Sequence, residues 1–467
     1  MTDVVIIGGG PGGYEAALVA SQLGGQVTLV ERQGLGGAAV LTDVVPSKTL
    51  IATADVMNTV RGAEELGLRL ADHEGDVVNV FSVDLDAVNA RVLKLASAQS
   101  ADIRKRLTAD NVRLIEGTGR LDGTEDVIAV TDDGEERIRA DVILVAVGTH
   151  PRELASARPD GERILNWTQL YRLRELPDRL IVVGSGVTGA EFASAYNVLG
   201  VDVVLVSSRD QVLPGEDADA ARLLQKVFER SGMTILSRQR ALAARVVGDE
   251  VVVTLSDGTT VTGSHCLMAV GSVPNTSGIG LEEAGVQLND AGYVVTDRVS
   301  RTTARGVYAA GDCTGIFALA SVAAMQGRIA MWHALGDAVA PLNLRHVSAN
   351  VFTAPEIATV GVSQTEVDAG DGKLLTQMLP LKGNARAKMR GITDGFVKVF
   401  CRPSTGIVVG GVVVAPIASE LIEALSLAVR EKLTVDQVAQ AFTVYPSLSG
   451  SVAEAARRLH RRAEQRD

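Results

Sequence analysis

Cysteine and aromatic residues are scarce in this chain of 467 residues, which has 48 glycines but only three cysteines. Because Cys266, Cys313 and Cys401 lie far apart in sequence, the chain has no disulfide-rich scaffold, zinc ribbon or C-x-x-C redox motif. Aromatic residues make up 3% of the chain and hydrophobic residues 46%. This glycine-rich, aromatic-poor composition is typical of an α/β enzyme, and not of a β-sandwich or a disordered protein.

Long apolar runs and excess positive charge are also missing. No uninterrupted run reaches the roughly 18–20 apolar residues that a membrane-spanning helix requires. The chain opens with a polar residue and a strand-like run, which leaves no room for a signal peptide, so we expect a cytoplasmic protein. The net charge of −11 argues against a nucleic-acid partner. No metal site is predicted, because the six histidines show no paired ligand spacing.

A glycine-rich motif follows the first apolar run. Residues 3–13 read DVVIIGGGPGG, with the spacing Gly8-x-Gly10-x-x-Gly13. A helical stretch over 14–23 and a second apolar run, which ends in Glu31, complete the unit. Such glycines allow a tight turn and close approach of the backbone to a pyrophosphate, while the helix N-terminus supplies N–H groups. Because a carboxylate can accept hydrogen bonds from a ribose diol, this copy is predicted to bind an adenosine with a free 2′-hydroxyl.

The same unit recurs 176 residues later, where Gly184 takes the place of Gly8. Its other glycines are Gly186 and Gly189, its helical stretch is 190–199, and Ser207-Ser208-Arg209 stands where the first copy has Glu31. Serine hydroxyls and Arg209 can bind a 2′-phosphate, which favours NADPH over NADH; the alternative is that Arg209 points to solvent. Two copies in register indicate one bound flavin dinucleotide and one exchangeable nicotinamide nucleotide.

Return strands support this pairing. Apolar runs end at Gly148 and Gly271, each followed by a proline, and fit the last strand of each unit as it leaves its domain. A third run, 306–312, ends in Gly-Asp before a helical stretch over 318–335. We expect Asp312 to lie at a helix N-terminus, where it can hold a ribityl hydroxyl. Strand-like runs such as 397–400 and 408–414 indicate a further α/β domain in the C-terminal third.

The ordered motifs resemble those of the pyridine nucleotide–disulfide oxidoreductase family, whose best-known members are lipoamide dehydrogenase and glutathione reductase. They are GGGPGG, Glu31, Gly36-Gly37, Pro46-Ser47-Lys48, Gly117-Thr118-Gly119, GSGVTGAE, AVGSVPNT and GVYAAGDCTG. The resemblance implies an α/β fold with two Rossmann-like dinucleotide-binding domains and a C-terminal α+β dimerisation domain, assembled as a homodimer. The predicted domains are an FAD-binding domain (1–150), an NAD(P)-binding domain (151–275), a return segment completing the FAD domain (276–345) and a dimerisation domain (346–467).

The resemblance also assigns cofactor residues. FAD is expected near Gly8, Gly10, Gly13, Glu31, Arg32, Lys48, Thr118, Gly148 and Asp312. The nicotinamide nucleotide, NADPH or NADH, is expected near Gly184, Gly186, Gly189, Glu191, Ser207, Ser208, Arg209 and Gly271. Lys48 and Glu191 would form an ion pair beside the flavin and serve hydride transfer.

The departures from the family pattern decide the predicted chemistry. Where the family has a G-G-x-C-x-x-x-x-C-x-P-S-K run that supplies a redox disulfide, this chain has Ala39 and Val44 in place of the two cysteines. The family's C-terminal H-P-x-x-x-E element aligns with residues 445–450, where Tyr445 replaces the histidine and Gly450 the glutamate. A phenol with a pKa of about 10 is a poor acid–base group at neutral pH. Disulfide reductase and lipoamide dehydrogenase activity are therefore excluded.

We predict an FAD-dependent oxidoreductase that passes electrons from NAD(P)H to a flat, apolar two-electron acceptor such as a quinone. The acceptor would dock against the wall left by Ala39 and Val44, or use the nicotinamide pocket in turn. The predicted catalytic residues are Lys48, Glu191 and Tyr445, of which Tyr445 either bonds a quinone carbonyl or fills an interface gap. The alternatives are a transhydrogenase between the two nicotinamide nucleotides, a peroxide-forming oxidase and a non-catalytic flavin-bound sensor.

Overall fold

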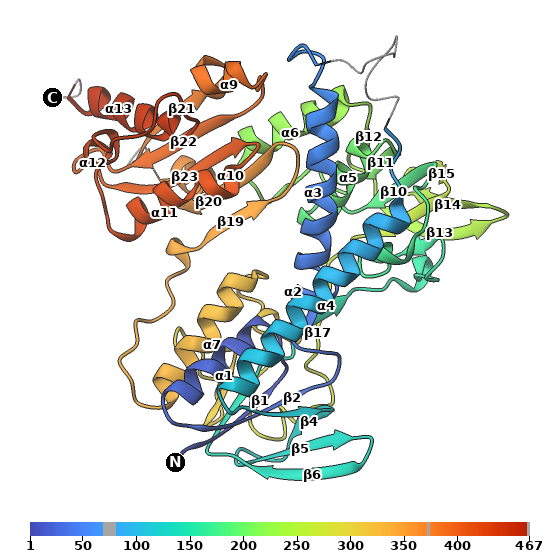
Figure 1. The fold of residues 1–467 in the computed structure, drawn as a ribbon, viewed down its shortest axis with the longest axis vertical. Coiled ribbons are helices and arrows are strands. Elements are labelled where there is room, and N and C mark those ends of the chain that lie inside the picture. Colours follow the sequence, from blue (N-terminus) through green and yellow to red (C-terminus); the bar gives the residue numbers. More distant parts are fainter. Residues whose placement is uncertain (69–80, 371–373, 465–467) are drawn as a thin grey trace. The chain divides into compact units, whose positions relative to one another are not determined.

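The structure, a computed structural model, describes residues 1–68, 81–370 and 374–464. The chain forms two compact units, each assembled from three stretches of sequence (Figure 1). Unit 1 consists of Met1–Thr49, Ala87–Arg152 and Gly271–Asn343. Unit 2 consists of Leu50–Asp86, Glu153–Val270 and Leu344–Asp467.

Unit 1 is built on a parallel sheet with the strand order β18-β7-β1-β2-β3. Both faces of this sheet are covered, so its central strands read as near-continuous apolar runs. The strands are β1 (Asp3–Ile7), β2 (Gln26–Glu31), β3 (Arg113–Glu116), β7 (Val142–Val145) and β18 (Val307–Ala309).

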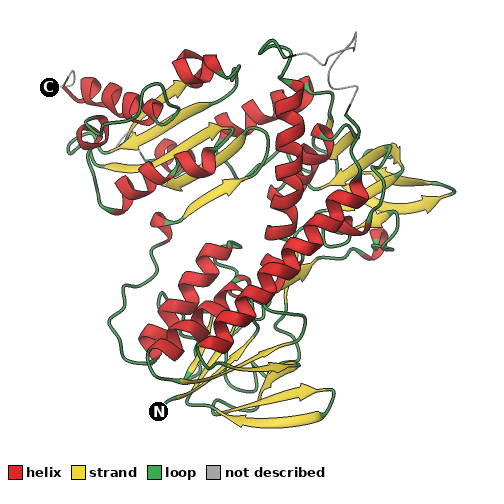
Figure 2. Cartoon of the chain, in the orientation of Figure 1, coloured by secondary structure: helices red, strands yellow, loops and turns green. Residues whose placement is uncertain are grey.

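Helices cover one face of this sheet, and α1 (Pro11–Gln22) and α7 (Ala320–Ala334) pack against each other there (Figure 2). Their backbones approach closely, since a Cβ atom placed on Gly327 would lie 2.0 Å from the carbonyl oxygen of Gly12. Helix α1 begins at Pro11, three residues before the predicted stretch, because proline fits the first helical position. The other unit 1 helices are α2 (Gly37–Leu41) and the parts of α3 (Val44–Arg61) and α4 (Leu85–Ala109) that fall in this unit.

A small antiparallel sheet covers the opposite face. It has the order β4-β5-β6, and its apolar side chains share a core with those of β1 and β7. The chain also forms a two-stranded antiparallel ribbon within unit 1. The strands are β4 (Thr118–Leu121), β5 (Asp126–Thr131), β6 (Gly134–Arg139) and, in the ribbon, β8 (Thr149–Pro151) and β17 (Ser272–Pro274).

Unit 2 repeats the parallel arrangement. Its first sheet has the order β12-β11-β10-β16-β9, so β10, β11 and β16 take the places that β1, β2 and β7 hold in unit 1. Helix α5 (Val187–Val198) follows the second glycine motif, and α6 (Ala218–Arg230) precedes β12. The strands are β9 (Ile164–Leu165), β10 (Arg179–Val183), β11 (Asp202–Val206), β12 (Thr234–Leu236) and β16 (His265–Met268), with an antiparallel sheet of β13 (Ala241–Val247), β14 (Glu250–Leu255) and β15 (Thr260–Gly263).

The C-terminal part of unit 2 is an antiparallel sheet with helices. Its order is β19-β20-β23-β22-β21, and a separate apolar core joins it to the helices that follow. The strands are β19 (Ser348–Val351), β20 (Glu356–Gly361), β21 (Leu375–Pro380), β22 (Phe396–Cys401) and β23 (Val408–Ala415). The helices are α8 (Gln364–Ala369), α9 (Ala385–Met389), α10 (Ala418–Leu421), α11 (Glu423–Arg430), α12 (Val435–Ala439) and α13 (Gly450–Glu464).

The predicted fold class, two Rossmann-like halves followed by an α+β domain, is confirmed. Within the described ranges, no helix combines the length and the apolar character needed to cross a membrane.

Candidate active site

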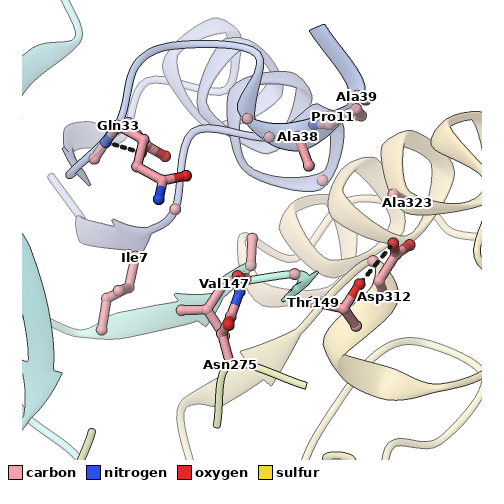
Figure 3. Close-up of a pocket in the computed structure, with 18 of the residues that line it drawn as sticks. Ile7, Pro11, Gln33, Ala38, Ala39, Val147, Thr149, Asn275, Asp312 and Ala323 are labelled. Carbon is pink, nitrogen blue, oxygen red and sulfur yellow. Dashed lines mark hydrogen bonds between the residues drawn. The ribbon is translucent and has the colours of Figure 1, made fainter. Parts of the chain in front are cut away.

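A cavity opens at the carboxyl ends of β1, β2, β7 and β18 in unit 1, which is where parallel α/β sheets bind ligands. Its lining comes from several separate segments of unit 1, among them the first glycine motif, the end of β2 and the turn at Asp312, which suits an extended organic ligand (Figure 3). The structure brings seven of the predicted cofactor residues together around it: Gly8, Gly10, Glu31, Arg32, Thr118, Gly148 and Asp312.

The first glycine motif forms the turn between β1 and α1. Gly8 has φ +104°, and a Cβ atom there would lie 2.3 Å from the carbonyl oxygen of Ala146. Gly13 allows the helix to close on the turn, because a Cβ atom there would lie 1.8 Å from the carbonyl oxygen of Gly8. Gly10 faces the cavity, where an added Cβ atom would meet no protein atom within 4 Å. This turn therefore aims the N-terminus of α1 at the cavity.

Glu31, at the end of β2, connects the glycine turn to the segment after β2 through hydrogen bonds at the cavity edge. One carboxylate oxygen accepts a hydrogen bond of 2.6 Å from the backbone N–H of Gly9, and the other accepts one of 2.6 Å from that of Gln33. Arg32 lies between Glu31 and Gln33 and is exposed. The backbone N–H groups of Gly9, in the glycine turn, and of Gln33, after β2, thus hold the Glu31 carboxylate beside the turn.

Asp312 lies at the opposite wall of the cavity, where its carboxylate and the hydroxyl of Thr149 face each other at 3.5 Å (Figure 3). Burial raises the pKa of this carboxyl, and the Thr149 hydrogen bond offsets part of that rise. Asp312 opens a 3-10 helix, Asp312–Thr314, and not α7, which begins at Ala320. Glycines with positive φ angles flank the 3-10 helix: Gly311 (+82°) precedes it, and Gly315 (+67°) ends it before α7.

Four polar residues that line the cavity were missed from the sequence: Gln33, Asp43, Thr149 and Asn275. The Asn275 side-chain amide donates to the carbonyl oxygen of Val147 at 2.9 Å. Thr149 comes directly after the return glycine Gly148, whereas Asn275 comes four residues after Gly271, behind β17. Only Thr149 therefore had a clear signal, as the polar residue next to a return glycine.

The second glycine motif has the same geometry in unit 2. The N–H of Gly184 donates to the carbonyl of Val206 at 3.0 Å, as that of Gly8 does to Val30 at 2.9 Å. A Cβ atom on Gly189 would again lie 1.8 Å from a carbonyl oxygen, that of Gly184, and one on Gly186 would meet no protein atom within 4 Å. The sequence repeat is therefore also a repeat of backbone hydrogen bonds.

The three residues after β11 differ in exposure. Ser207 is fully buried, and its hydroxyl shares a hydrogen bond of 2.7 Å with that of Ser185 and accepts one of 3.1 Å from the N–H of Arg209. Ser208 and Arg209 are exposed. Ser207 therefore organises this loop, and the other two residues present their side chains to solvent.

Two predicted nicotinamide residues have partners in other parts of the chain. Glu191, on α5, is 3% exposed and accepts a hydrogen bond of 2.9 Å from the backbone N–H of Phe352. Gly271 belongs to unit 1, where its carbonyl accepts from the N–H of Arg152 at 2.9 Å, whereas the second glycine motif belongs to unit 2.

The sequence pattern of the pyridine nucleotide-disulphide oxidoreductases matches residues 2–327, and that of their dimerisation domain matches residues 347–456. This chain belongs to that family. The family predicted from the sequence motifs is therefore confirmed.

Relatives in this oxidoreductase family have more than one named activity. A protein of Mycobacterium tuberculosis named NAD(P)H dehydrogenase (quinone) is 55% identical over 98% of this chain and 94% of its own length. The dihydrolipoyl dehydrogenase of Zymomonas mobilis is 33% identical over 99% of this chain and 98% of its own. The crystal structure of LpdA from Mycobacterium tuberculosis has 55% identity and a TM-score of 0.93, and the match covers 98% of this chain and 100% of that one.

The positions that carry the redox disulfide in other members of the family line the cavity. Ala39 lies in α2 and Val44 begins α3, and both contribute to the wall. Lys48 lies one turn further along α3 and is partly buried. Both disulfide positions are therefore apolar here, while Asp43, between them in sequence, also lines the cavity.

The three cysteines are free and buried. Burial raises the thiol pKa of Cys266 and Cys313 to about 12 and that of Cys401 to about 11. The thiol of Cys313, directly after Asp312, donates to the carbonyl oxygen of Ala310 at 3.3 Å. A neutral, enclosed thiol is unreactive, so these residues act as small apolar side chains.

Tyr445, where other family members have histidine, lies between α12 and α13 and is 85% exposed. Its neighbours Phe442 and Val444 are also exposed, at 108% and 78%. The segment presents three large apolar side chains to solvent.

Proposed function

We propose that this chain is a homodimeric, FAD-containing NAD(P)H dehydrogenase that uses a quinone as its acceptor. The net reaction converts NAD(P)H, a proton and a quinone into NAD(P)⁺ and a hydroquinone. The 55% identical relative named NAD(P)H dehydrogenase (quinone) supports this activity. The relative named dihydrolipoyl dehydrogenase supports the same fold but has a different named activity, so the residues of this chain must decide between them.

The cavity of unit 1 suits FAD. The N-terminus of α1 and the unobstructed face of Gly10 offer N–H groups and space to a pyrophosphate, and Glu31 offers a carboxylate to an adenosine ribose. Asp312 and Thr149 offer polar atoms for a ribityl chain at the other end. When bound, FAD supplies two-electron chemistry between a nicotinamide nucleotide and an acceptor.

The nicotinamide nucleotide is assigned to the second glycine motif, with Gly186 facing the pyrophosphate. Arg209 and Ser208 are exposed where the first copy has a carboxylate, which suits a 2′-phosphate. The next residue, Asp210, is ion-paired with Arg238 at 2.6 Å, so its charge is offset. These features favour NADPH over NADH. Lys48 and Glu191 remain the residues assigned to hydride transfer.

The observation that carries the acceptor assignment is the apolar wall formed by Ala39 and Val44. A disulfide acceptor needs a dithiol relay, and a relay needs accessible thiolates. The three thiols of this chain are buried, with pKa values raised well above neutrality. A flat apolar ring needs only contact with the cavity, and a small, apolar wall offers it.

The homodimer is supported by the dimerisation-domain match and by the exposed apolar segment that contains Phe442, Val444 and Tyr445. Side chains of this size, exposed together, are typical of an interface. Sedimentation of the FAD-loaded protein at two concentrations tests the assembly, with twice the chain mass expected at both.

The activity is tested by anaerobic turnover of the purified, FAD-loaded protein against a panel of acceptors. NADPH and NADH are each paired with benzoquinone, lipoamide, glutathione disulfide and the other nucleotide in oxidised form. We expect turnover with benzoquinone and none with either disulfide. Turnover of lipoamide would contradict the assignment. Nucleotide exchange without quinone turnover would replace it with a transhydrogenase.

A further inference from the structure

Lys398 is the most deeply buried cation of unit 2 among the residues that the structure describes. It lies on β22 of the C-terminal sheet and is 1% exposed. Its Nζ atom bonds both carboxylate oxygens of Asp217, at 2.9 and 2.7 Å, and one oxygen of Asp219, at 2.7 Å. Breaking such a buried pair on one side leaves an uncompensated charge, so this contact resists separation.

Asp217 has a second role at the same point. Its carboxylate caps the N-terminus of α6, accepting from the backbone N–H groups of Asp219 at 3.0 Å and Ala220 at 3.1 Å. One side chain therefore joins the C-terminal sheet to the first turn of α6.

The loop before α6 runs from the end of β11 to Asp217, over residues 207–216. It folds back onto the second glycine motif: the N–H of Leu213 donates to the carbonyl of Ser185 at 2.8 Å, and the hydroxyls of Ser207 and Ser185 share a hydrogen bond. This loop carries the exposed Ser208 and Arg209. At its far end the loop contacts α6 twice: Asp217 caps the helix, and the N–H of Val212 donates to the side-chain oxygen of Gln225 at 3.3 Å.

We propose that Lys398 is a positioning residue for nicotinamide nucleotide binding. By holding Asp217, the C-terminal sheet fixes the loop of residues 207–216 against the second glycine motif. The domain that matches the dimerisation pattern thereby has a second role, in nucleotide affinity. This inference rests on the proposed function, because it takes Ser208 and Arg209 as part of the nucleotide site.

The chain offers a matched control at the other end of α6. Arg230, in its last turn, pairs with Asp394 at 2.5 Å and so also joins α6 to the C-terminal domain. That pair is partly exposed and lies away from the loop. Arg230→Met removes an interdomain ion pair without disturbing Asp217.

The experiment measures binding of NADP⁺ and NAD⁺ to the oxidised, FAD-loaded protein by calorimetry, together with FAD content and steady-state KM and kcat. The variants are Lys398→Met, the double variant Lys398→Met with Asp217→Asn, and Arg230→Met. Asparagine keeps the helix cap and removes the unpaired charge, so the double variant stays testable if the single one unfolds. We expect nucleotide affinity to fall about tenfold in the first two, with KM raised and kcat and FAD content within about twofold of wild type, and no change in the third.

Two outcomes overturn the inference. One is wild-type nucleotide affinity in Lys398→Met with FAD retained; the other is recovery of affinity in the double variant, which would assign the loss to the unpaired Asp217. Failure of the proposed function is separate: the wild-type protein would bind nucleotide and respond to these substitutions but would not reduce benzoquinone.

Discussion

The side-chain carbonyl of Gln326 accepts a hydrogen bond of 2.8 Å from the backbone N–H of Gly311, the residue before Asp312. Gln326 is 1% exposed on α7, and its amide also donates to the hydroxyl of Thr314 at 3.3 Å. One buried side chain therefore holds both ends of the 3-10 turn that presents Asp312 to the cavity.

Replacing Gln326 by leucine is expected to weaken FAD retention. The change leaves the buried N–H of Gly311 unpaired, which costs about 1–3 kcal/mol and loosens the turn. FAD content after gel filtration measures the effect, and Met325→Leu, at the neighbouring exposed position, is the control. Equal FAD content in both variants would show that the turn holds without Gln326.

The two glycine motifs allow a paired test. Gly13→Ala and Gly189→Ala each place a methyl group 1.8 Å from a backbone carbonyl oxygen, a clash that cannot be relieved by a side-chain rotation. We expect about 1–3 kcal/mol of destabilisation in each, with FAD lost from the first and nicotinamide affinity lost from the second.

Gly10→Ala and Gly186→Ala are the matched controls, because a methyl group there meets no protein atom within 4 Å. Both variants should have the unfolding temperature of the wild-type protein. Each should nevertheless bind its nucleotide less tightly than the wild-type protein does. Wild-type nucleotide affinity in these two variants would mean that the motifs do not face the pyrophosphates.

The cysteines are expected to be dispensable. Because burial raises their thiol pKa values to about 11–12, all three are neutral across the physiological pH range. Treatment of the native protein with iodoacetamide, and Cys313→Ala in particular, should leave quinone reduction within about twofold of the untreated wild type. If alkylation abolished the activity and bound substrate prevented that loss, a thiol mechanism would be established instead.

Asp312 should make the apoprotein less stable as the pH rises. Burial raises its pKa in the folded state above the unfolded value, so its contribution is fully present below the unfolded pKa and is lost as the pH rises through the folded pKa. Asp312→Asn should therefore raise the unfolding temperature of the apoprotein at neutral pH and leave it unchanged at a pH below the usual range of aspartate. The same substitution should lower FAD content. A stabilisation that is equal at both pH values would assign the effect to something other than this charge.

Much of the candidate site could be predicted from the sequence because its determinants are local. The spacing of Gly8, Gly10 and Gly13 specifies a turn whose hydrogen bonds recur at Gly184, and Glu31 is the last residue of its strand. The strand order then brings these segments to one edge of a sheet, where Asp312 also lies.

The parts that could not be predicted depend on contacts between distant residues. The run that contains Lys398 reads as an ordinary strand, and only Asp217 and Asp219, 181 and 179 residues away, explain a buried lysine there. Ser207 is predicted as a ligand-facing residue by its position after β11, yet its hydroxyl is enclosed because the loop folds back onto Ser185. Neither contact leaves a pattern in the neighbouring sequence.

We propose that electrons leave this protein for a quinone and not for a disulfide. This proposal is tested most directly by anaerobic double mixing, in which the FAD-loaded protein is first reduced with NADPH and then mixed with benzoquinone or lipoamide while the visible absorbance of the flavin is followed. We expect NADPH to bleach the flavin and benzoquinone to restore its absorbance within the mixing experiment, whereas lipoamide should not restore it. Restoration by lipoamide, or a reduced flavin that benzoquinone leaves bleached, would contradict the proposal.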